Sequence, residues 1–313
     1  MPDHARPDLL GHRHRGPTFA GDMTFLRRVR TRDIRGADIV VSGIPFDSAT
    51  SFRPGARFGP NAIRAASAQL AELAGHAFPF DMDPFATLAV ADWGDCPLDY
   101  GHPEAVVDEV EAHARSILAE AGMMVTFGGD HFISYPLLRA HAERHGPLAL
   151  VHFDAHVDTW PDDDGRLDHG SMFLRAKREG LLDVEHSVQV GIRSYSAERA
   201  FTVLDAPWVH DNGTAAALER ILAVVGNRKA YLTVDIDCLD PAHAPGTGTP
   251  VPGGLTSAQL LALIRGLGPL DIVGLDVVEV SPPYDHAEIT ALAAATVAHD
   301  FICLQALKSR NHV

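Results

Sequence analysis

The feature that most constrains the fold of this chain is a repeated alternation of short apolar runs with longer amphipathic stretches. Seven apolar runs have the length and β-branched content of buried strands, namely residues 37–46, 88–92, 123–128, 148–154, 188–192, 230–235 and 272–278. Six stretches have the apolar spacing of helices, namely residues 60–73, 103–122, 134–145, 214–225, 256–267 and 288–308. Strands and helices that alternate at intervals of roughly 30 residues are typical of βαβ units.

This alternation predicts one large α/β domain built on a parallel sheet with helices on both faces. An eighth strand is expected near Trp208, and no Pro-, Gly- or Ser-rich linker divides the chain. A closed eight-stranded barrel is the alternative arrangement of the same units. In both arrangements ligands bind at the carboxyl ends of the strands, so we expect functional residues there. Residues 1–30 are expected to form an N-terminal arm and residues 31–313 the domain.

Composition argues against several classes of protein. Asp and Glu number 41 against 26 Lys and Arg, which gives a formal net charge of −15. Proteins that bind nucleic acids or anionic membranes depend on basic residues, so neither partner is expected. Three widely spaced cysteines without a CxxC pair indicate a reducing compartment, and the N-terminus lacks the apolar segment of a secretory signal. We therefore expect a cytoplasmic protein.

Three of the predicted strands end in, or lead directly into, candidate metal ligands. These are His131 after the strand at 123–128, Asp154, His156 and Asp158 at the end of that at 148–154, and Asp235 and Asp237 at the end of that at 230–235. Residues at positions i, i+2 and i+4 of an extended segment project from one face. The side chains at 154, 156 and 158 can therefore point the same way, and those at 235 and 237 repeat the arrangement.

The four carboxylates of this set require cations. Each would cost several kcal/mol if it were buried without a partner, and the ligand-bearing segments themselves contain no Lys or Arg. Carboxylates combined with imidazoles suit Mn²⁺ or a similar ion. Six ligands are too many for one catalytic ion with an open position, but they fit two ions roughly 3.5–4 Å apart that share carboxylates. The sequence therefore predicts a two-metal centre.

Long motifs surround these residues. They are GGDH at 128–131, DAHVD at 154–158 and the segment at 235–254, with further matching segments at 42–47, 53–64 and 277–295. Together they resemble the ureohydrolase family, which includes arginases and agmatinases. The resemblance implies a single-domain, three-layer sandwich with an eight-stranded, mostly parallel sheet flanked by helices, the arginase-like fold. This expectation agrees with the fold inferred from the alternation of apolar runs.

The resemblance also implies roles for particular residues. One Mn²⁺ would be held by His131, Asp154, Asp158 and Asp235, and the other by His156, Asp154, Asp235 and Asp237. A hydroxide between the two ions would be the nucleophile, because metal ions lower the pKa of bound water towards about 7. His169 would transfer a proton, and Glu279 would bind the guanidinium as a bidentate pair. Asp158 is placed with them among the catalytic residues.

Departures from arginases indicate the substrate. Residues 159–168 lack the Asn and Ser that help bind the amino-acid carboxylate in arginases, and they contain three successive aspartates. An acidic loop repels an α-carboxylate and favours a second cationic group. Asp162 and Asp163 are therefore candidate contacts for the far end of the substrate, and Thr249 is a further candidate contact. The segments that look most like agmatinase are residues 131–142, 201–206 and 275–285.

We therefore expect hydrolysis of agmatine, a small guanidine that is cationic at both ends, to putrescine and urea. The resemblance also implies a homo-oligomer, either a trimer or a hexamer. Hydrolysis of a guanidino acid, of the guanidinobutyrase or proclavaminate amidinohydrolase type, stays open because Arg166 or Arg193 could bind a carboxylate tail. A protein that only binds metal or polyamines is a further alternative, against which the intact ligand set argues. His152 is expected to be structural, and the role of His243 is left open.

Overall fold

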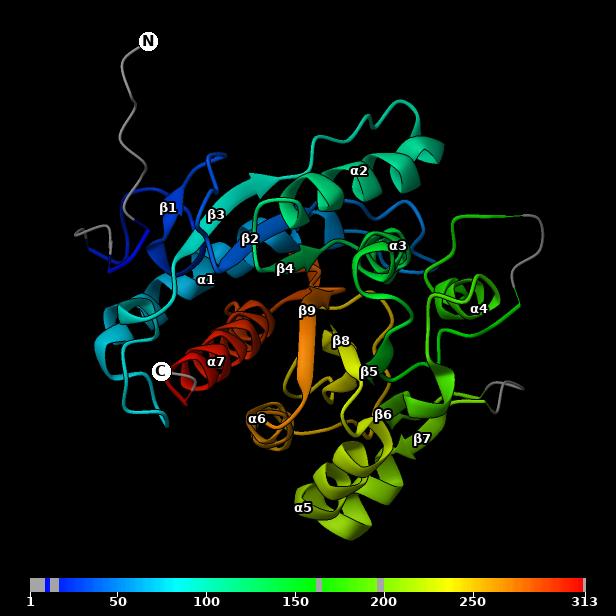
Figure 1. Cartoon of the computed structure of the whole chain (residues 1–313). Helices are drawn as coiled ribbons and strands as arrows, with labels where there is room; N and C mark the ends of the chain where they lie inside the picture. The colour runs from blue at the N-terminus through cyan, green and yellow to red at the C-terminus, as the bar shows by residue number, and fades with distance from the viewer. Residues whose placement is uncertain (1–8, 12–16, 162–164, 196–199, 312–313) are drawn as a thin grey trace.

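One twisted parallel sheet forms the centre of the molecule (Figure 1). The computed structural model describes residues 9–11, 17–161, 165–195 and 200–311. Within this part of the chain the sheet has nine strands in the order β1-β3-β2-β4-β9-β8-β5-β6-β7, and neighbouring strands are parallel. The strands are β1 (Val29–Arg30), β2 (Ile39–Ile44), β3 (Val90–Asp95), β4 (Met123–Gly128), β5 (Ala149–Phe153), β6 (Val188–Ile192), β7 (Thr202–Asp205), β8 (Lys229–Asp235) and β9 (Asp271–Val278).

Helices cover both faces of this sheet, so the molecule has three layers (Figure 1). One face carries α1 (Gly59–Glu72), α7 (Ile289–Asn311), α6 (Ser257–Gly266) and α5 (Ala206–Val225), each packed against the next. The other face carries α2 (Val106–Leu118), α3 (Ser134–His145) and α4 (Met172–Arg178). Two apolar cores result, one between the sheet and each layer of helices.

The double covering explains the apolar runs in the sequence. Every residue of β2, β5 and β6 is buried, and in β8 and β9 only the first residue is exposed. A strand with only one covered face would alternate apolar and polar residues, whereas a strand between two helical layers is apolar throughout. The charged residues that these strands carry are consequently concentrated at their ends.

The fold class predicted from the sequence is confirmed, with small differences in the elements. The sheet is open, with β1 and β7 at its edges, so the closed barrel is wrong. All seven apolar runs overlap a strand, although β3 extends three residues beyond its run, and the eighth strand lies at Thr202–Asp205, just before Trp208, which belongs to α5. The ninth strand, β1, has two residues and the unexpected α4 has seven, too few to produce a periodic pattern.

The order of the strands places a ligand site. β4 lies beside β2, but the next strand in the chain, β5, lies three places further along the sheet, with β9 and β8 between them. Where the order of a parallel sheet changes in this way, the carboxyl ends of the strands leave a crevice in which ligands bind. The residues that follow β4, β9, β8 and β5 are therefore delivered to one place.

The described part of the N-terminal segment is attached to this core. Phe25 and Leu26 are buried, and the ring of Phe25 packs edge-on against Phe127 of β4 at 4.8 Å between centroids. The backbone N–H of Phe25 donates to Asp92 Oδ2 at 2.8 Å. The boundary between an arm of residues 1–30 and the domain stays a prediction.

By length and composition, one helix in the described residues is apolar enough to cross a membrane. It is the C-terminal helix α7, over Ile289–Arg310, and 72% of its most apolar window is buried inside the fold. It packs against α1 and α6 on one face of the sheet (Figure 1). Burial of this extent is what a core helix shows, and the apolar composition of α7 is explained by its place in the fold.

Candidate functional site

The six predicted metal ligands come together at the carboxyl ends of three central strands. His131 follows β4, the ligands at 154, 156 and 158 follow β5, and those at 235 and 237 lie at the end of β8 and just after it. Five of the six side chains are buried, and His156 is partly exposed. Parallel strands that end at the same edge of the sheet are sufficient to produce this convergence.

Two overlapping groups of ligand atoms result. His131 Nδ1 lies 3.0 Å from Asp154 Oδ2, 3.0 Å from Asp158 Oδ2 and 3.3 Å from Asp235 Oδ2. His156 Nδ1 lies 3.3 Å from Asp154 Oδ1 and 3.1 Å from the second oxygen, Oδ2, of Asp237. Asp154 therefore offers one oxygen to each group, which is the position of a carboxylate that bridges two ions.

The hydrogen bonds of His131 test whether these groups fit metal ions. Its Nε2 lies 2.8 Å from Thr233 Oγ1, and that hydroxyl donates to Asp276 Oδ1 at 2.5 Å. Thr233 therefore accepts a hydrogen bond from Nε2–H, so in the neutral ring the lone pair belongs to Nδ1. Nδ1 is buried and makes no hydrogen bond within the described part of the chain, although three carboxylates surround it. A lone pair among carboxylate oxygens fits a bound cation, and the ring is oriented by its outer partner as in metal sites.

The carboxylates themselves are crowded. Burial, reinforced by Asp237 and Asp154, raises the pKa of Asp235 well above its ordinary value. Burial and the neighbouring Asp154 also raise the pKa of Asp158. Burial raises the pKa of Asp154 too, but the imidazoles of His152 and His131 outweigh it, so this pKa is well below its ordinary value. The cluster brings several buried carboxyl groups into a small volume, and divalent cations would stabilise their charged forms.

His152, which was expected to be structural, lies within the cluster. Its Nε2 lies 2.7 Å from Asp154 Oδ2, and its Nδ1 lies 3.0 Å from the side-chain amide of Gln189. The amide of Gln189 also donates to the carbonyl of Val157 at 2.7 Å. The amide donates to Nδ1, so Nε2 carries the proton and donates it to Asp154. His152 thus orients one of the central carboxylates.

Glu279 and His169 form a pair beside the metal-ligand cluster. Glu279 follows β9 directly, and its Oε1 accepts a hydrogen bond from the backbone N–H of His131 at 2.9 Å. The same oxygen lies 2.7 Å from His169 Nδ1. Glu279 is completely buried, and its second oxygen, Oε2, has no hydrogen-bond partner among the residues that the structure describes. The pair therefore leaves one carboxylate oxygen available for a ligand.

A loop on the other side of His169 completes its contacts. The backbone N–H of Ser51 donates to His169 Nε2 at 3.0 Å, and the hydroxyl of Ser51 lies 2.8 Å from the same nitrogen. Burial lowers the pKa of His169, but the Glu279 carboxylate outweighs it and raises this pKa to about 9. Protonation of Nε2 requires the backbone N–H of Ser51 to give up the hydrogen bond that it donates to this nitrogen.

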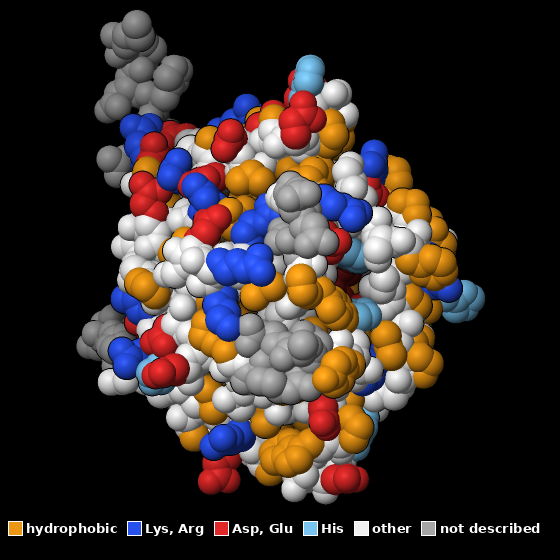
Figure 2. Space-filling view, turned by 90° about the vertical axis from the view of Figure 1, so that its right-hand side faces the viewer, with side chains coloured by type: hydrophobic (Ala, Val, Ile, Leu, Met, Phe, Trp, Pro, Cys, Tyr) orange, Lys and Arg blue, Asp and Glu red, His pale blue; other side chains and the backbone are white. Residues whose placement is uncertain are grey.

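A cavity of about 210 Å³ opens above these groups. Its described lining is made of Ser51, His156, Asp158, Trp160, Asp168, His169, Gly170, Asp235 and Thr249. Figure 2 shows a hollow on the face of the molecule where acidic and His side chains are visible below the surrounding surface. The predicted contact Thr249 lines the cavity and donates to Asp237 Oδ2 at 3.3 Å. The predicted contacts Asp162 and Asp163 lie outside the described residues.

The basic residues considered for a carboxylate tail are placed elsewhere. The guanidinium of Arg193 donates to backbone carbonyls, including that of Asp237 at 2.6 Å and that of Val251 at 2.7 Å. Arg193 therefore ties together the loops that follow β8. Arg166 is exposed and is absent from the described lining of the cavity. Among the described lining residues there is no Lys or Arg.

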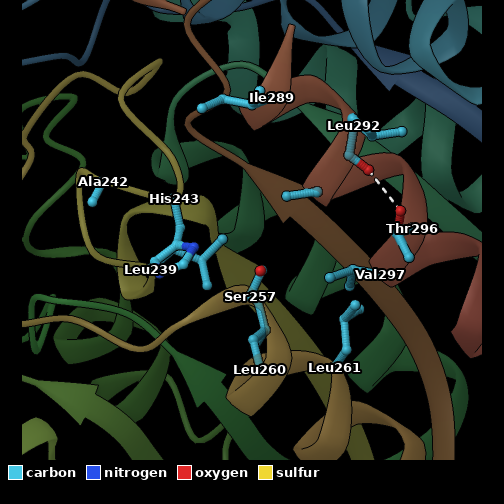
Figure 3. A pocket seen from close by; sticks show the side chains of 11 residues that line it. Leu239, Ala242, His243, Ser257, Leu260, Leu261, Ile289, Leu292, Thr296 and Val297 are labelled. Carbon is cyan, nitrogen blue, oxygen red and sulfur yellow. Dashed lines mark hydrogen bonds between the residues drawn. The ribbon is translucent and has the colours of Figure 1, made fainter. Parts of the chain in front are cut away.

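A second cavity, of about 360 Å³, is separate from this site and mainly apolar (Figure 3). It lies between α6, α7 and the loop after β8, and its lining includes Leu260, Leu292 and Val297. His243 lines this cavity rather than the metal-ligand cluster. The structure thus separates His243 from the predicted metal centre.

Comparisons with known proteins agree with this geometry. The sequence profile of the arginase family matches residues 37–303. An agmatinase from Chromobacterium violaceum is 57% identical over 290 residues, which are 92% of this chain and 89% of that protein. The solved structure of a hypothetical agmatinase from Burkholderia thailandensis has a TM-score of 0.95 and 55% identity, covering 98% of this chain and 97% of that one. Proclavaminate amidino hydrolase from Streptomyces clavuligerus has a TM-score of 0.86 and 39% identity, covering 93% of this chain and 99% of that one.

Proposed function

This chain belongs to the arginase family, and from that membership and the geometry of the site we propose that it hydrolyses agmatine to putrescine and urea. The observation that carries the proposal is that two groups of side chains lie next to one another at one edge of the sheet. One is the cluster of carboxylates and imidazoles around His131 Nδ1, and the other is the buried Glu279 with an unpartnered oxygen. A metal centre beside a buried carboxylate suits hydrolysis of a cationic guanidinium.

The ligand set supports two metal ions per subunit, and we propose Mn²⁺. Asp154 and Asp235 would be shared, with His131 and Asp158 on one side and the remaining two ligands, at 156 and 237, on the other. Oxygen-rich sites with imidazole suit Mn²⁺ better than zinc sites rich in thiolate. Burial and Asp235 raise the pKa of the neighbouring Cys238 thiol well above its ordinary value. Ions bound here would supply Lewis-acid activation of a water molecule near neutral pH.

Glu279 would bind the guanidinium. Its Oε1 is already engaged by the backbone of His131 and by His169, so Oε2 is the oxygen that supports substrate binding. A carboxylate with one fixed oxygen presents the other in a defined direction, which orients the guanidinium carbon towards the metal centre. The charge-assisted hydrogen bond also compensates the burial of both charges.

His169 would hold and transfer the proton that the leaving amine requires. Its Nδ1 faces Glu279, and the raised pKa of the ring lets it carry a proton near neutral pH. Water adds to the guanidinium carbon, and the C–N bond to the alkyl chain breaks. The departing nitrogen accepts a proton and leaves as the amine, while urea retains the carbon. Asp158, which faces His131 Nδ1 and lines the cavity, would act as a ligand beside the reacting carbon.

Agmatine is favoured over guanidino acids by the charge of the cavity. Its described lining has Asp158, Asp168 and Asp235 and no Lys or Arg, so a carboxylate tail finds no cation there. The similarity to proclavaminate amidino hydrolase keeps a guanidino acid as the second candidate. A protein that only binds metal or polyamines is less well supported, because it leaves the buried pair of Glu279 and His169 without a catalytic use.

Urea release from a panel of guanidines tests the proposal. Protein loaded with Mn²⁺ is expected to release urea from agmatine at a rate at least about a hundredfold above that from arginine or 4-guanidinobutyrate, because the uncompensated carboxylate of either competitor is disfavoured in an acidic cavity. Putrescine should appear in equal amount. Preference for 4-guanidinobutyrate would favour the second candidate, and no release from any guanidine would favour a binding protein.

Two further expectations rest on family membership and composition. We propose a homo-oligomer, a trimer or a hexamer, and a cytoplasmic location. Exposed aromatic side chains such as Phe19 and Phe52, at 88% and 67%, support the oligomer. The reducing compartment agrees with the three buried cysteines, which are all free.

A further inference from the structure

One carboxylate in the cavity belongs to neither the metal ligands nor the guanidinium site. Asp168 lines the cavity together with Asp158 and Asp235, which are assigned to the metals. It precedes His169 directly, so it is attached to the residue that contacts Glu279. The roles proposed above leave this third carboxylate without a function.

Asp168 is held in place by one of its oxygens. Its Oδ1 accepts a hydrogen bond from the backbone N–H of Gly170 at 2.8 Å. No hydrogen bond or ion pair of Oδ2 is found within the described residues, and the side chain is half-buried. The carboxyl group is therefore fixed by a turn, and its charge has no cationic partner among the residues described around it.

Trp160 stands beside this carboxyl group. Its backbone N–H donates to the carbonyl of Gly170 at 3.0 Å, and its indole Nε1–H donates to the carbonyl of Tyr195 at 3.0 Å. A Cβ added to Gly170 would lie 3.0 Å from Cε3 of the indole and 3.3 Å from Asp168 Oδ1. Gly170 thus allows the indole and the carboxyl group to approach one another, and both line the same cavity.

An aromatic ring next to a fixed carboxylate recognises a primary ammonium. The carboxylate provides a charge-assisted hydrogen bond, and the indole provides a cation–π contact. We propose that Asp168 and Trp160 bind the terminal ammonium of the guanidine substrate, an inference that rests on the proposed function. This pair would distinguish an aminoalkyl guanidine from one that ends in a carboxylate or a methyl group.

Asp168→Asn tests the charge without removing the turn, because the amide oxygen of Asn still accepts from Gly170 N–H. Two substrates distinguish the contribution of the ammonium from that of the guanidinium. They are agmatine and butylguanidine, which has the same alkyl chain without the amine. We expect kcat/KM for agmatine to fall at least about tenfold, mainly through KM, while that for butylguanidine changes by less than about threefold. Metal content and melting temperature should match those of the wild type.

Trp160 is tested in the same way with two variants. Trp160→Phe keeps an aromatic face and should lose less agmatine affinity than Trp160→Leu, again with butylguanidine as the control.

Equal losses of kcat/KM for agmatine and butylguanidine in Asp168→Asn would overturn the proposal, since they indicate a structural role for Asp168. Unchanged KM for agmatine in Asp168→Asn would overturn it as well.

Calorimetric measurement of agmatine binding tests the ammonium site independently of agmatine hydrolysis. If the wild type released no urea from agmatine, the proposed function would fail. Agmatine would still be expected to bind the wild type at least about tenfold more tightly than Asp168→Asn. Equal binding to both proteins would then reject the ammonium site.

Discussion

At the scale of single residues, Glu279 and Asp158 have an unusual backbone conformation. Both lie in the left-handed region, with φ of 64° and 49°, although neither is Gly. Such conformations cost of order 1–3 kcal/mol and persist where the surrounding structure determines them, often at active sites. For Glu279, the backbone N–H donates to Gly129 O at 2.8 Å, which holds the strained residue at the end of β9. The strain thus places the side chain beside the metal-ligand cluster.

Glu279→Gln tests the guanidinium role of this residue. The variant keeps the size of the side chain but removes the charge that faces the cationic substrate. We expect kcat for agmatine to fall by about a hundredfold or more, while two metal ions per chain remain bound. Urea release and elemental analysis of the same preparation check both parts. Wild-type turnover in this variant would remove Glu279 from the mechanism.

The sequence predicted the six candidate metal ligands but not the contacts of the residues around them. Those six were predicted because their spacing along the strands is regular. His152 follows the same i, i+2 alternation as Asp154, and applying that rule one step earlier would have included it. Ser51 could not be found in this way, because it reaches His169 from 118 residues away in the chain. The free oxygen of Glu279 likewise depends on two partners that only the fold brings together.

At the scale of elements, the sheet and its helices are joined by a buried ion pair. Arg64 of α1 is completely buried, and its guanidinium contacts Asp92 Oδ2 at 2.9 Å and Asp95 Oδ1 at 2.6 Å, both on β3. A further donor reaches the carbonyl of Gly94 at 3.0 Å. Removal of one partner of a buried pair leaves the other charge uncompensated, which is more costly than the pair is favourable.

Arg64→Ala should therefore destabilise the protein by about 3–5 kcal/mol. Arg35→Ala is the matched control, because Arg35 pairs with Asp33 at 2.7 Å on the surface with 56% of its side chain exposed. Such surface pairs contribute little, so the control should be close to the wild type. Urea unfolding of both variants makes the comparison. Similar stabilities of the two variants would contradict the role assigned to Arg64.

The contact between α2 and the sheet has a pH dependence of its own. His113 of α2 is buried, and its Nε2 lies 2.7 Å from Ser42 Oγ of β2. Burial, assisted by Arg32, lowers the pKa of His113 to about 4. The unfolded chain, with a pKa of about 6.5, binds more protons between these values. Stability from this residue is therefore complete above about pH 6.5 and is lost as the pH falls towards 4.

His113→Gln removes this titration. The wild type should lose stability relative to the variant by up to about 3 kcal/mol as the pH falls from 6.5 to 4. Unfolding by urea at several pH values measures the difference, which isolates His113 from other histidines such as His141. Parallel loss of stability in both proteins over this range would show that His113 does not contribute.

The elements themselves were predictable to different degrees. Long apolar runs such as 123–128 and 230–235 give strands with nearly the expected ends, because burial on both faces leaves a continuous apolar signal. β1 and α4 gave no such signal, being two and seven residues long. α5 begins at Ala206 rather than near 214, and the non-helical Gly213 inside it obscured the pattern.

At the scale of the whole molecule, strand order rather than any single motif builds the site. The predicted ligands are spread from His131 to Asp237, and the proposed guanidinium carboxylate follows at Glu279. The strands that carry them are neighbours in the order β4-β9-β8-β5, although this is not their order in the chain. Part of the acidic excess of the chain is located here, since four aspartates face the proposed metals, Glu279 the proposed guanidinium and Asp168 the proposed ammonium.

We propose that these strand ends hold two metal ions on which agmatine hydrolysis depends. Titration of metal-free protein with Mn²⁺, with bound metal and urea release from agmatine measured at each step, tests it most directly. We expect binding to saturate at two ions per chain, with urea release appearing as the sites fill. Full agmatine turnover by metal-free protein would contradict this proposal. A titration in which the protein binds no Mn²⁺ would contradict it as well.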